Sequence, residues 1–322
     1  MNITHYMKSE KSGLAFTTLE LVEAEERQGH HVCLREPTDA TGMPGPILYG
    51  SNGVAPDVEL IHSQMPLTSY FTRTPKFCWA HGEPLSSVGN GISMKALIDM
   101  APKLDAFIAM RPEELSIWSS LKRTYLVPKG IDLARFCPME TLAHDPENPL
   151  SKLEGEPAVI YVEHWRGQRN PLYLLIAMQQ VWQAYPKARL HLYNCQNAKM
   201  FETFQALIKC GKFWPFMRTL KGPVPEADMP RLYNRADIVV SCLDPLYARS
   251  LECFGAGKAF IGPGYTDREY PWHCTLDPDS MAQAIIACWT DYGRLDYRAW
   301  AEKKHDVEET VRQSVAVYQR YL

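Results

Sequence analysis

The stretch DPLYARSLECFGAGKAF (residues 244–260) places two carboxylates, Asp244 and Glu252, eight residues apart and then runs through two glycines into an apolar segment. The apolar run DIVVSCL stands directly before it, so the pattern predicts strand, loop, helix and strand in that order. We expect the helix to begin near Ala248–Ser250. The free N–H groups and positive dipole end of a helix start favour an anion such as a phosphate. The stretch therefore indicates a ligand beyond the carboxyl end of a strand in a parallel sheet.

Two interpretations of the polar residues in this stretch stay open at this point. In the functional one, Arg249 adds positive charge for an anion, and Glu252 accepts a hydrogen bond from a sugar hydroxyl. In the structural one, Glu252 only complements the helix dipole and Asp244 caps a turn.

Apolar runs of strand length alternate with helical patterns along nearly the whole chain. A helix is expected over residues 13–29, where Gly29 closes it. The expected strands are HVCLRE, VELIHS, KFCWAHG, DAFIAMR and TYLVPKG in the first part, and AVIYVE, ARLHLYN, DIVVSCL and AFIGPG in the second. Near-continuous apolar strands are typical of parallel sheets that are covered on both faces, so the pattern predicts an α/β fold.

The length of 322 residues favours two domains over one. Residues 137–157 are rich in Pro, Glu and small polar residues without any period, which is typical of a linker. We therefore expect an N-terminal Rossmann-like domain over residues 1–140 and a C-terminal one over residues 150–305. A helix over residues 306–322 is expected to pack back on the first domain.

The composition argues against several classes of protein, although it leaves a local basic groove open. A net charge of −3 argues against a non-specific nucleic-acid binder, which normally carries a basic excess. No apolar run reaches the about 18 residues of a membrane span, and the first residues lack the apolar core of a signal peptide, so we expect a cytoplasmic protein. The nine cysteines form no Cys-x-x-Cys pair, and we interpret them as reduced residues rather than zinc ligands.

With these observations in place, residues 244–260 resemble the Glu-x7-Glu signature of retaining glycosyltransferases of the GT-B fold, family 4 in particular. Glu252 matches the second acid, which in that family holds the ribose of a nucleotide sugar. Asp244 stands where the family has its first acid, which contacts the transferred sugar. Backbone amides between the two acids meet the phosphates, and the resemblance thereby implies donor contacts from Ala248, Arg249, Ser250 and Leu251.

Two further segments resemble the same family near the expected linker. LVPKGIDLARFCP (126–138) is similar to the family's segment just before the linker, and EHWRGQRNPLYLLIAM (163–178) to the segment whose Arg and Lys neutralise the donor diphosphate. Arg169 falls on that Lys. Either His164 or Arg166 takes the place of that Arg, and the sequence leaves this choice open.

The resemblance extends to the nucleobase and to the transferred sugar. KGPVPEADMPRLYNRADIVVS (221–241) is similar to the segment that passes the nucleobase, which implies that Pro223 and Val224 contact the donor. AHGEP resembles the family's His-Gly, whose His lies near the transferred sugar, and this His is His81. The motif DPD at 277–279 has the Asp-x-Asp form that another glycosyltransferase fold uses for metal, but it opens a helical pattern and is better interpreted as a helix cap.

The likeness covers most of residues 77–265 and implies a GT-B enzyme, with two Rossmann-like domains facing across a cleft. It implies transfer of a hexose, with retention, from a nucleotide sugar to a hydroxyl, and a UDP-sugar is the favoured donor. His81, Asp244 and Arg169 are the expected catalytic residues, and no metal or other cofactor is expected. The acceptor stays open between a glycan, a lipid, a small molecule and a hydroxymethylated DNA base. The alternative is a catalytically silent nucleotide-sugar-binding module.

His81→Ala tests the expected role of His81. If His81 touches the transferred sugar, the variant loses turnover and keeps its melting temperature. A buried structural histidine has the opposite signature, because losing about 1 kcal/mol of stability lowers the melting temperature by several degrees while turnover per folded molecule stays normal. Donor turnover and a thermal melt on the same sample decide between the two.

Overall fold

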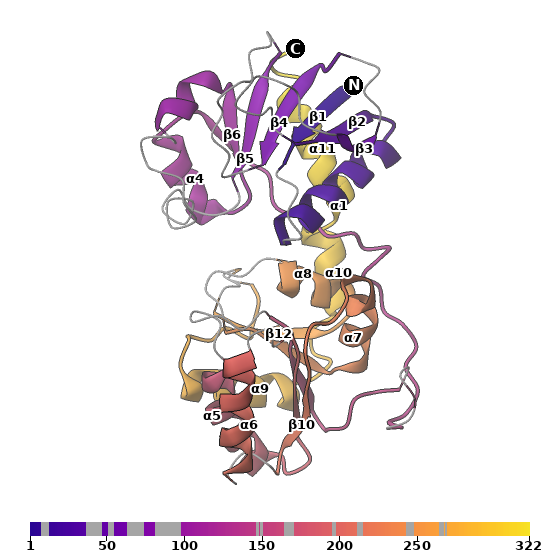
Figure 1. Ribbon diagram of the computed structural model, residues 1–322, viewed down its shortest axis with the longest axis vertical. Coiled ribbons are helices and arrows are strands. Elements are labelled where there is room, and N and C mark those ends of the chain that lie inside the picture. The colour runs from indigo at the N-terminus through magenta and orange to yellow at the C-terminus, as the bar shows by residue number, and fades with distance from the viewer. Residues whose placement is uncertain are drawn as a thin grey trace. The chain divides into compact units, whose positions relative to one another are not determined.

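The computed structural model describes residues 1–7, 13–36, 47–50, 55–62, 74–80, 98–145, 148, 151–163, 171–194, 198–210, 215–242, 248–263, 267 and 269–322. The chain forms two compact units. Unit 1 consists of Met1–Asp132 together with Lys304–Leu322, and unit 2 consists of Leu133–Lys303. Each unit contains one central β-sheet with helices packed on it (Figure 1).

The sheet of unit 1 has seven strands in the order β3-β2-β1-β4-β5-β6-β7. Their bounds are β1 Asn2–Tyr6, β2 His31–Arg35, β3 Ile47–Gly50, β4 Val58–His62, β5 Lys76–Ala80, β6 Ala106–Ala109 and β7 Thr124–Leu126. Neighbours pair in parallel except β3, which is antiparallel to β2 at the edge of the sheet. The α/β prediction is confirmed. Strands β1 and β3 were not expected from the sequence.

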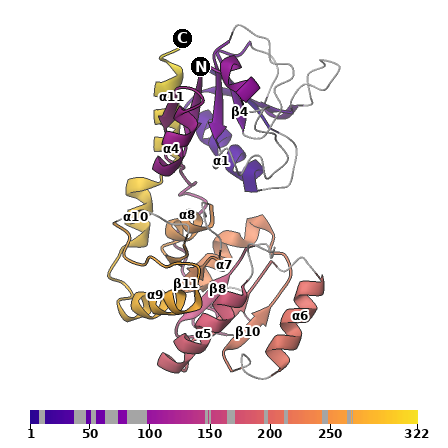
Figure 2. The same cartoon turned by 90° about the vertical axis from the view of Figure 1, so that its left-hand side faces the viewer.

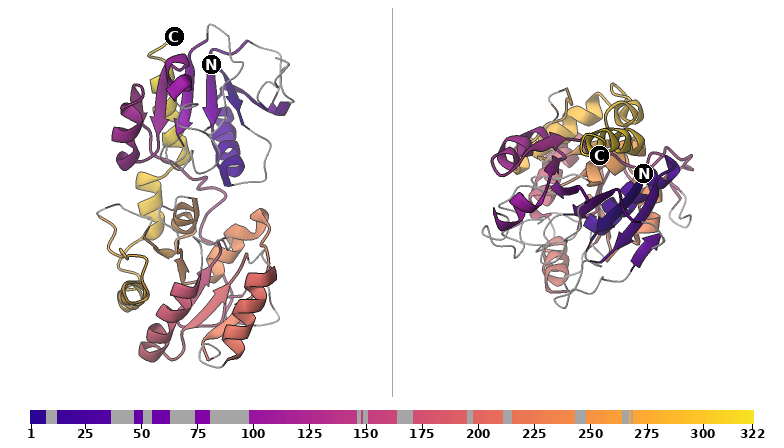
Figure 3. Two further views of the ribbon diagram at one scale, coloured as in Figure 1. Left: turned by 60° about the vertical axis from the view of Figure 1, so that its left-hand side comes forward. Right: turned by 90° about the horizontal axis from the view of Figure 1, so that it is seen from above.

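Helices cover both faces of this sheet. Their bounds are α1 Gly13–Arg27, η1 Ala101–Lys103, α4 Pro112–Ser119 and α11 Val307–Tyr318. Buried residues of α1 and α11 join Leu60 and Phe77 in one core cluster, and the yellow helix α11 lies against the sheet of unit 1 (Figure 3). Trp118 of α4 packs on Phe107 in a second cluster on the other face, with ring centroids 4.7 Å apart.

The start of α11 is bound to the segment that follows β7. The backbone N–H of Ile131 donates to the carbonyl of His305 at 2.8 Å, and the hydroxyl of Thr310 donates to the carbonyl of Pro128 at 2.9 Å. Gly130 lies between these contacts, where an added Cβ would come within 2.4 Å of the Cα of Val307. The close approach of two backbones therefore requires glycine at this position.

The sheet of unit 2 has five parallel strands in the order β10-β9-β8-β11-β12. Their bounds are β8 Ala158–Tyr161, β9 Arg189–Leu192, β10 Met217–Leu220, β11 Ile238–Val240 and β12 Ala259–Ile261. The chain winds outward from β8 to β10 on one side and from β11 to β12 on the other, so the sheet is doubly wound. The sequence analysis did not predict β10.

The helices of unit 2 are α5 Leu172–Ala184, α6 Ala198–Lys209, η2 Glu226–Asp228, α7 Met229–Arg235, α8 Ala248–Gly255, α9 Pro278–Thr290 and α10 Tyr297–Lys304. Helices α5 and α9 lie side by side (Figure 2). Asp277 caps α9 by accepting the N–H of Ser280 at 2.8 Å, which confirms the interpretation of the DPD motif. Among the described helices, none has both the length and the apolar character needed to cross a bilayer.

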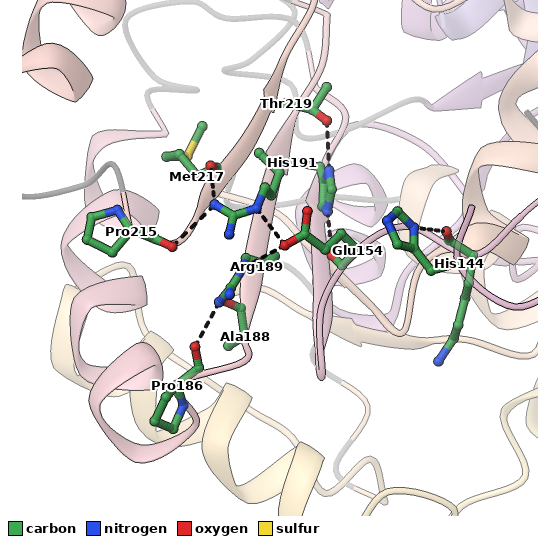
Figure 4. A network of polar contacts seen from close by, with 11 residues as sticks. His144, Glu154, Pro186, Ala188, Arg189, His191, Pro215, Met217 and Thr219 are labelled. Carbon is green, nitrogen blue, oxygen red and sulfur yellow. Dashed lines mark hydrogen bonds and ion pairs between the residues drawn. The ribbon is translucent and has the colours of Figure 1, made fainter. Parts of the chain in front are cut away.

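The segment expected to be a linker has almost no regular structure but is bound to the sheet of unit 2 (Figure 4). An Oε1 atom of Glu154 accepts from Arg218 Nε at 2.6 Å and from Arg189 Nε at 3.1 Å. Burial alone would raise the pKa of Glu154, but these two bonds hold it below its ordinary value. The buried His191 bonds the Glu154 carbonyl and the Thr219 hydroxyl, and burial lowers the pKa of His191 to about 4.

Gly130→Ala is expected to destabilise unit 1. The added methyl overlaps the backbone of Val307, and overpacking of this kind costs about 1–3 kcal/mol. Gly29→Asn is the control, because asparagine tolerates the left-handed backbone of Gly29, at φ 82°, and no atom lies within 4 Å of an added Cβ there. A thermal melt should show a fall of several degrees for Gly130→Ala and little change for Gly29→Asn. Equal melting temperatures for the two variants would contradict the close packing at Gly130.

Candidate functional site

The carboxyl ends of the strands of unit 2 carry a row of buried polar side chains. In a doubly wound sheet, ligands lie beyond these ends, at the point where the strand order reverses, which here is between β8 and β11. Glu163 follows β8, Asn194 follows β9 and Ser241 follows β11. All three side chains are buried, with 3% or less of their surface exposed. Polar groups at this depth and at this edge indicate a binding site.

Glu163 and Ser241 meet across the reversal point itself. The Ser241 hydroxyl donates a hydrogen bond of 2.7 Å to Oε1 of Glu163. The thiol of Cys242 is also near this carboxyl group. Burial raises the pKa of the thiol most, and Glu163 raises it further. The carboxyl group of Glu163 is therefore a close neighbour of both Ser241 and Cys242 at this end of β8.

Asn194 connects β8 to the segment that contains Pro223 and Val224. Its backbone is in the left-handed region, with φ 60°, which asparagine adopts more readily than most residues. Its amide nitrogen donates to the carbonyl of Val162, and its Oδ1 accepts from the N–H of Val224 at 2.6 Å. The two predicted nucleobase contacts, Pro223 and Val224, are thereby held next to the carboxyl end of β8.

Helix α8 begins at Ala248, as the sequence predicts, and carries Glu252 in a buried position. Oε2 of Glu252 accepts a hydrogen bond of 2.5 Å from the hydroxyl of Tyr233, a fully buried residue of α7. Ser250 and Leu251 are buried in the same helix turn. A specific partner therefore holds Glu252 in place. A glutamate that only complements the helix dipole would not need such a partner.

The side chains of several predicted site residues lie outside the described part of the chain. These are His81, Asp244, Arg169, His164 and Arg166, with Ala248 and Arg249 described only in their backbone. Their roles stay predictions. Within the described ranges, no group of three His, Cys, Asp or Glu side chains is arranged to hold a metal ion.

The chain's sequence matches no family model and no curated protein. Its structure matches the sucrose-phosphate synthase of Thermosynechococcus elongatus with a TM-score of 0.74 at 15% identity, covering 99% of this chain and 98% of that one. A glycosyltransferase of Rickettsia africae matches with a TM-score of 0.74 at 13% identity, with the same coverage. Anabaena HepE, solved in complex with UDP-glucose, matches with a TM-score of 0.71 at 14% identity over 100% of both chains.

The chain has the GT-B fold. The fold that the resemblance implied is thereby confirmed, and the match extends over the first 60 residues, where the sequence shows little likeness. In this GT-B chain, the predicted donor-binding residues Glu252, Ser250, Leu251, Pro223 and Val224 belong to unit 2. Their contacts with a donor stay predictions.

Sequence reasoning assigned no role to four polar residues of this site. Glu163, Asn194 and Ser241 fall inside runs that were interpreted as strands, and Glu163 and Ser241 also end or begin segments that resemble the family, but none of the three was singled out. A polar residue directly after the last apolar residue of a parallel strand is nevertheless a usable signal. Tyr233 gives no such signal, because it lies 19 residues before Glu252 with a complete strand between them.

Tyr233→Phe and Glu252→Gln are expected to be strongly non-additive. Tyr233→Phe deletes the donor of this buried hydrogen bond, and Glu252→Gln replaces its acceptor by a weaker amide oxygen. Because both changes act on the same bond, the double variant should be more stable than the sum of the single losses predicts, by about 0.5–3 kcal/mol. Tyr49→Phe is the matched control, since Tyr49 donates to Glu26 at 2.6 Å on the surface of unit 1. The control cycle pairs Tyr49→Phe with Glu26→Gln. Denaturant unfolding of the wild type and of the three variants in each cycle gives the coupling energies. Additive losses for Tyr233 and Glu252 would show that the bond does not form.

Proposed function

We propose that this protein is a retaining glycosyltransferase that moves a hexose from a UDP-sugar to a hydroxyl group. The observation that carries the proposal is the buried Glu252 in the first turns of α8, held by Tyr233 beside a doubly wound sheet of a GT-B chain. The structural neighbours support it, because they are named as glycosyltransferases and sucrose-phosphate synthase, and HepE is solved with UDP and with UDP-glucose.

The donor would lie along the carboxyl edge of the sheet in unit 2. Its base packs by Pro223 and Val224, which Asn194 positions, and its ribose hydroxyls bond to Glu252. A carboxylate has lone pairs enough to accept from both Tyr233 and a ribose.

The diphosphate would lie at the start of α8. The N–H groups of the first turn, over Ala248–Ser250, would donate hydrogen bonds to it, and Arg169 would add charge. These groups would stabilise the negative charge that develops on the leaving group. Because they already point at its position, they need not move during the reaction. Metal independence is part of the proposal.

The transferred sugar would meet His81 and Asp244, and the acceptor would bind through unit 1. The acceptor class is a hydroxyl compound, which includes a glycan, a lipid, a small molecule and a hydroxymethylated DNA base. A catalytically silent nucleotide-sugar-binding module is the second candidate, and His164 in place of the family's arginine is the residue that favours it.

Titration calorimetry with UDP and UDP-glucose, in the presence of a chelator, tests the donor site. The wild-type protein should bind both ligands, and Glu252→Gln should weaken both by about tenfold, because a hydrogen bond to a charged group is lost. Glu202→Gln, an exposed change on α6, is the control and should bind normally.

The outcomes separate the proposals. Failure of wild-type protein to bind UDP and UDP-glucose contradicts both candidate functions, and binding that appears only after Mg²⁺ is added contradicts metal independence. Release of UDP from UDP-glucose, with water as acceptor, distinguishes the enzyme from the silent module.

A further inference from the structure

Helix α8 ends at Gly255, and a side chain binds its last carbonyl group. The last four carbonyl groups of a helix have no partner within the helix and must find one elsewhere. In α8, the backbone N–H groups of residues 256–258 serve the first three of these four. The fourth, the carbonyl of Gly255, accepts from Nη1 of Arg298 at 3.0 Å. Arg298 belongs to α10, which lies next to α8 (Figure 1), and a cation at this end of a helix also interacts favourably with the helix dipole.

The same nitrogen of Arg298 binds the first residues of unit 2. Nη1 donates to the carbonyl of Leu133 and to the carbonyl of Phe136, each at 2.9 Å. Nε donates to Glu302 at 2.7 Å, which orients the guanidinium group. An added Cβ at Gly255 would come within 2.7 Å of the Phe136 carbonyl oxygen, so the end of α8 packs directly on this segment. One guanidinium group therefore holds the end of α8 against the start of unit 2.

Phe136 connects these contacts to the hydrogen bond that holds Glu252. Its fully buried ring packs against the ring of Tyr233, with the two centroids 6.2 Å apart. Tyr233 in turn donates to Oε2 of Glu252. Glu252 also lies only one helical turn before Gly255, whereas the start of α8 lies two turns before it. Arg298 therefore supports Glu252 in two ways, through the last turn of α8 and through the two packed rings.

We propose that Arg298 is a positioning residue for the nucleotide-sugar donor, which holds the last turn of α8 so that the carboxylate of Glu252 meets the ribose hydroxyls. This inference rests on the proposed function. A binding group works only within about 0.5 Å of its productive position, so a shift of this turn weakens binding although no contact with the ligand is deleted. Because Arg298 does not touch the donor, its loss acts through Glu252.

Titration calorimetry with UDP tests the inference on four proteins: wild type, Arg298→Met, Glu252→Gln and the double variant. Methionine keeps much of the length and packing of the arginine side chain but donates no hydrogen bond. Arg298→Met should weaken UDP binding about tenfold when Glu252 is present, and less than about threefold in the Glu252→Gln background, where the carboxylate that it positions is gone. Equal losses in the two backgrounds would show that Arg298 does not act through Glu252.

Arg189→Met is the matched control for a purely structural arginine. Arg189 also belongs to unit 2, and it also donates from Nη1 to backbone carbonyls, those of Pro186 and Ala188, and from Nε to a glutamate (Figure 4). It lies at the start of β9, at the opposite edge of the sheet from the candidate site. Both methionine variants should lower the melting temperature, and only Arg298→Met should weaken UDP binding.

Two further variants complete the test. Arg298→Lys should restore most of the UDP affinity, because one ammonium group can donate to several carbonyls at once. Gly255→Ala serves if Arg298→Met does not fold: its methyl group displaces the end of α8 from the Phe136 carbonyl while Arg298 stays, and UDP should again bind more weakly only when Glu252 is present.

The outcomes separate this inference from the proposed function. If wild-type protein binds UDP and the folded variants at Arg298 and Gly255 bind it equally well, the inference is overturned and the proposed function stands. A loss of UDP affinity in Arg189→Met as large as that in Arg298→Met would also overturn it. If wild-type protein does not bind UDP, the proposed function itself fails.

Discussion

Two parallel strands can be joined only by a connection that returns from one end of the sheet to the other, so every strand of such a sheet delivers the residue after it to the same edge. This constraint builds the candidate site. Ser241 follows Glu163 by 78 residues and still donates to it, because β8 and β11 pair in register. Asn194 reaches the end of β8 from the next strand for the same reason. Helix α8 then starts from the same edge, which lets one short segment of chain present N–H groups and Glu252 together.

The alternation of strands and helices could be predicted from the sequence because most strands are apolar runs. Strand β1 could not, since Asn2–Tyr6 contains the buried residues Thr4, His5 and Tyr6, and the last two have polar partners. His5 bonds Glu25 of α1 at 2.6 Å and His62 of β4 at 2.8 Å. Partners that distant along the chain leave no periodic pattern. The apolar run of β3 is only three residues long, Ile47–Tyr49, and β10 has only two apolar residues, Met217 and Leu220, so neither strand is recognised alone.

The candidate site could be predicted only in part. The start of α8 and the position of Glu252 follow from local spacing, which a helix preserves. The bond from Tyr233 to Glu252 depends on how α7 and α8 pack around β11, and the bond from Ser241 to Glu163 depends on strand register. Neither property is local in sequence. The predictions for His81, Asp244 and Arg169 concern side chains outside the described residues.

The division of unit 1 between the two ends of the chain has a consequence for biosynthesis. Val311 and Tyr318 of α11 complete the core that Leu60 and Phe77 begin, and Arg27 at the end of α1 pairs with Glu308 at 2.8 Å. Helix α11 leaves the ribosome after the whole of unit 2. Domains usually fold in order of synthesis, N-terminal first. Here the described strands of the later-made unit all come from one continuous stretch of chain, so that unit can fold before the earlier one is complete. Until α11 emerges, the nascent chain carries an apolar sheet face that α1 covers only in part.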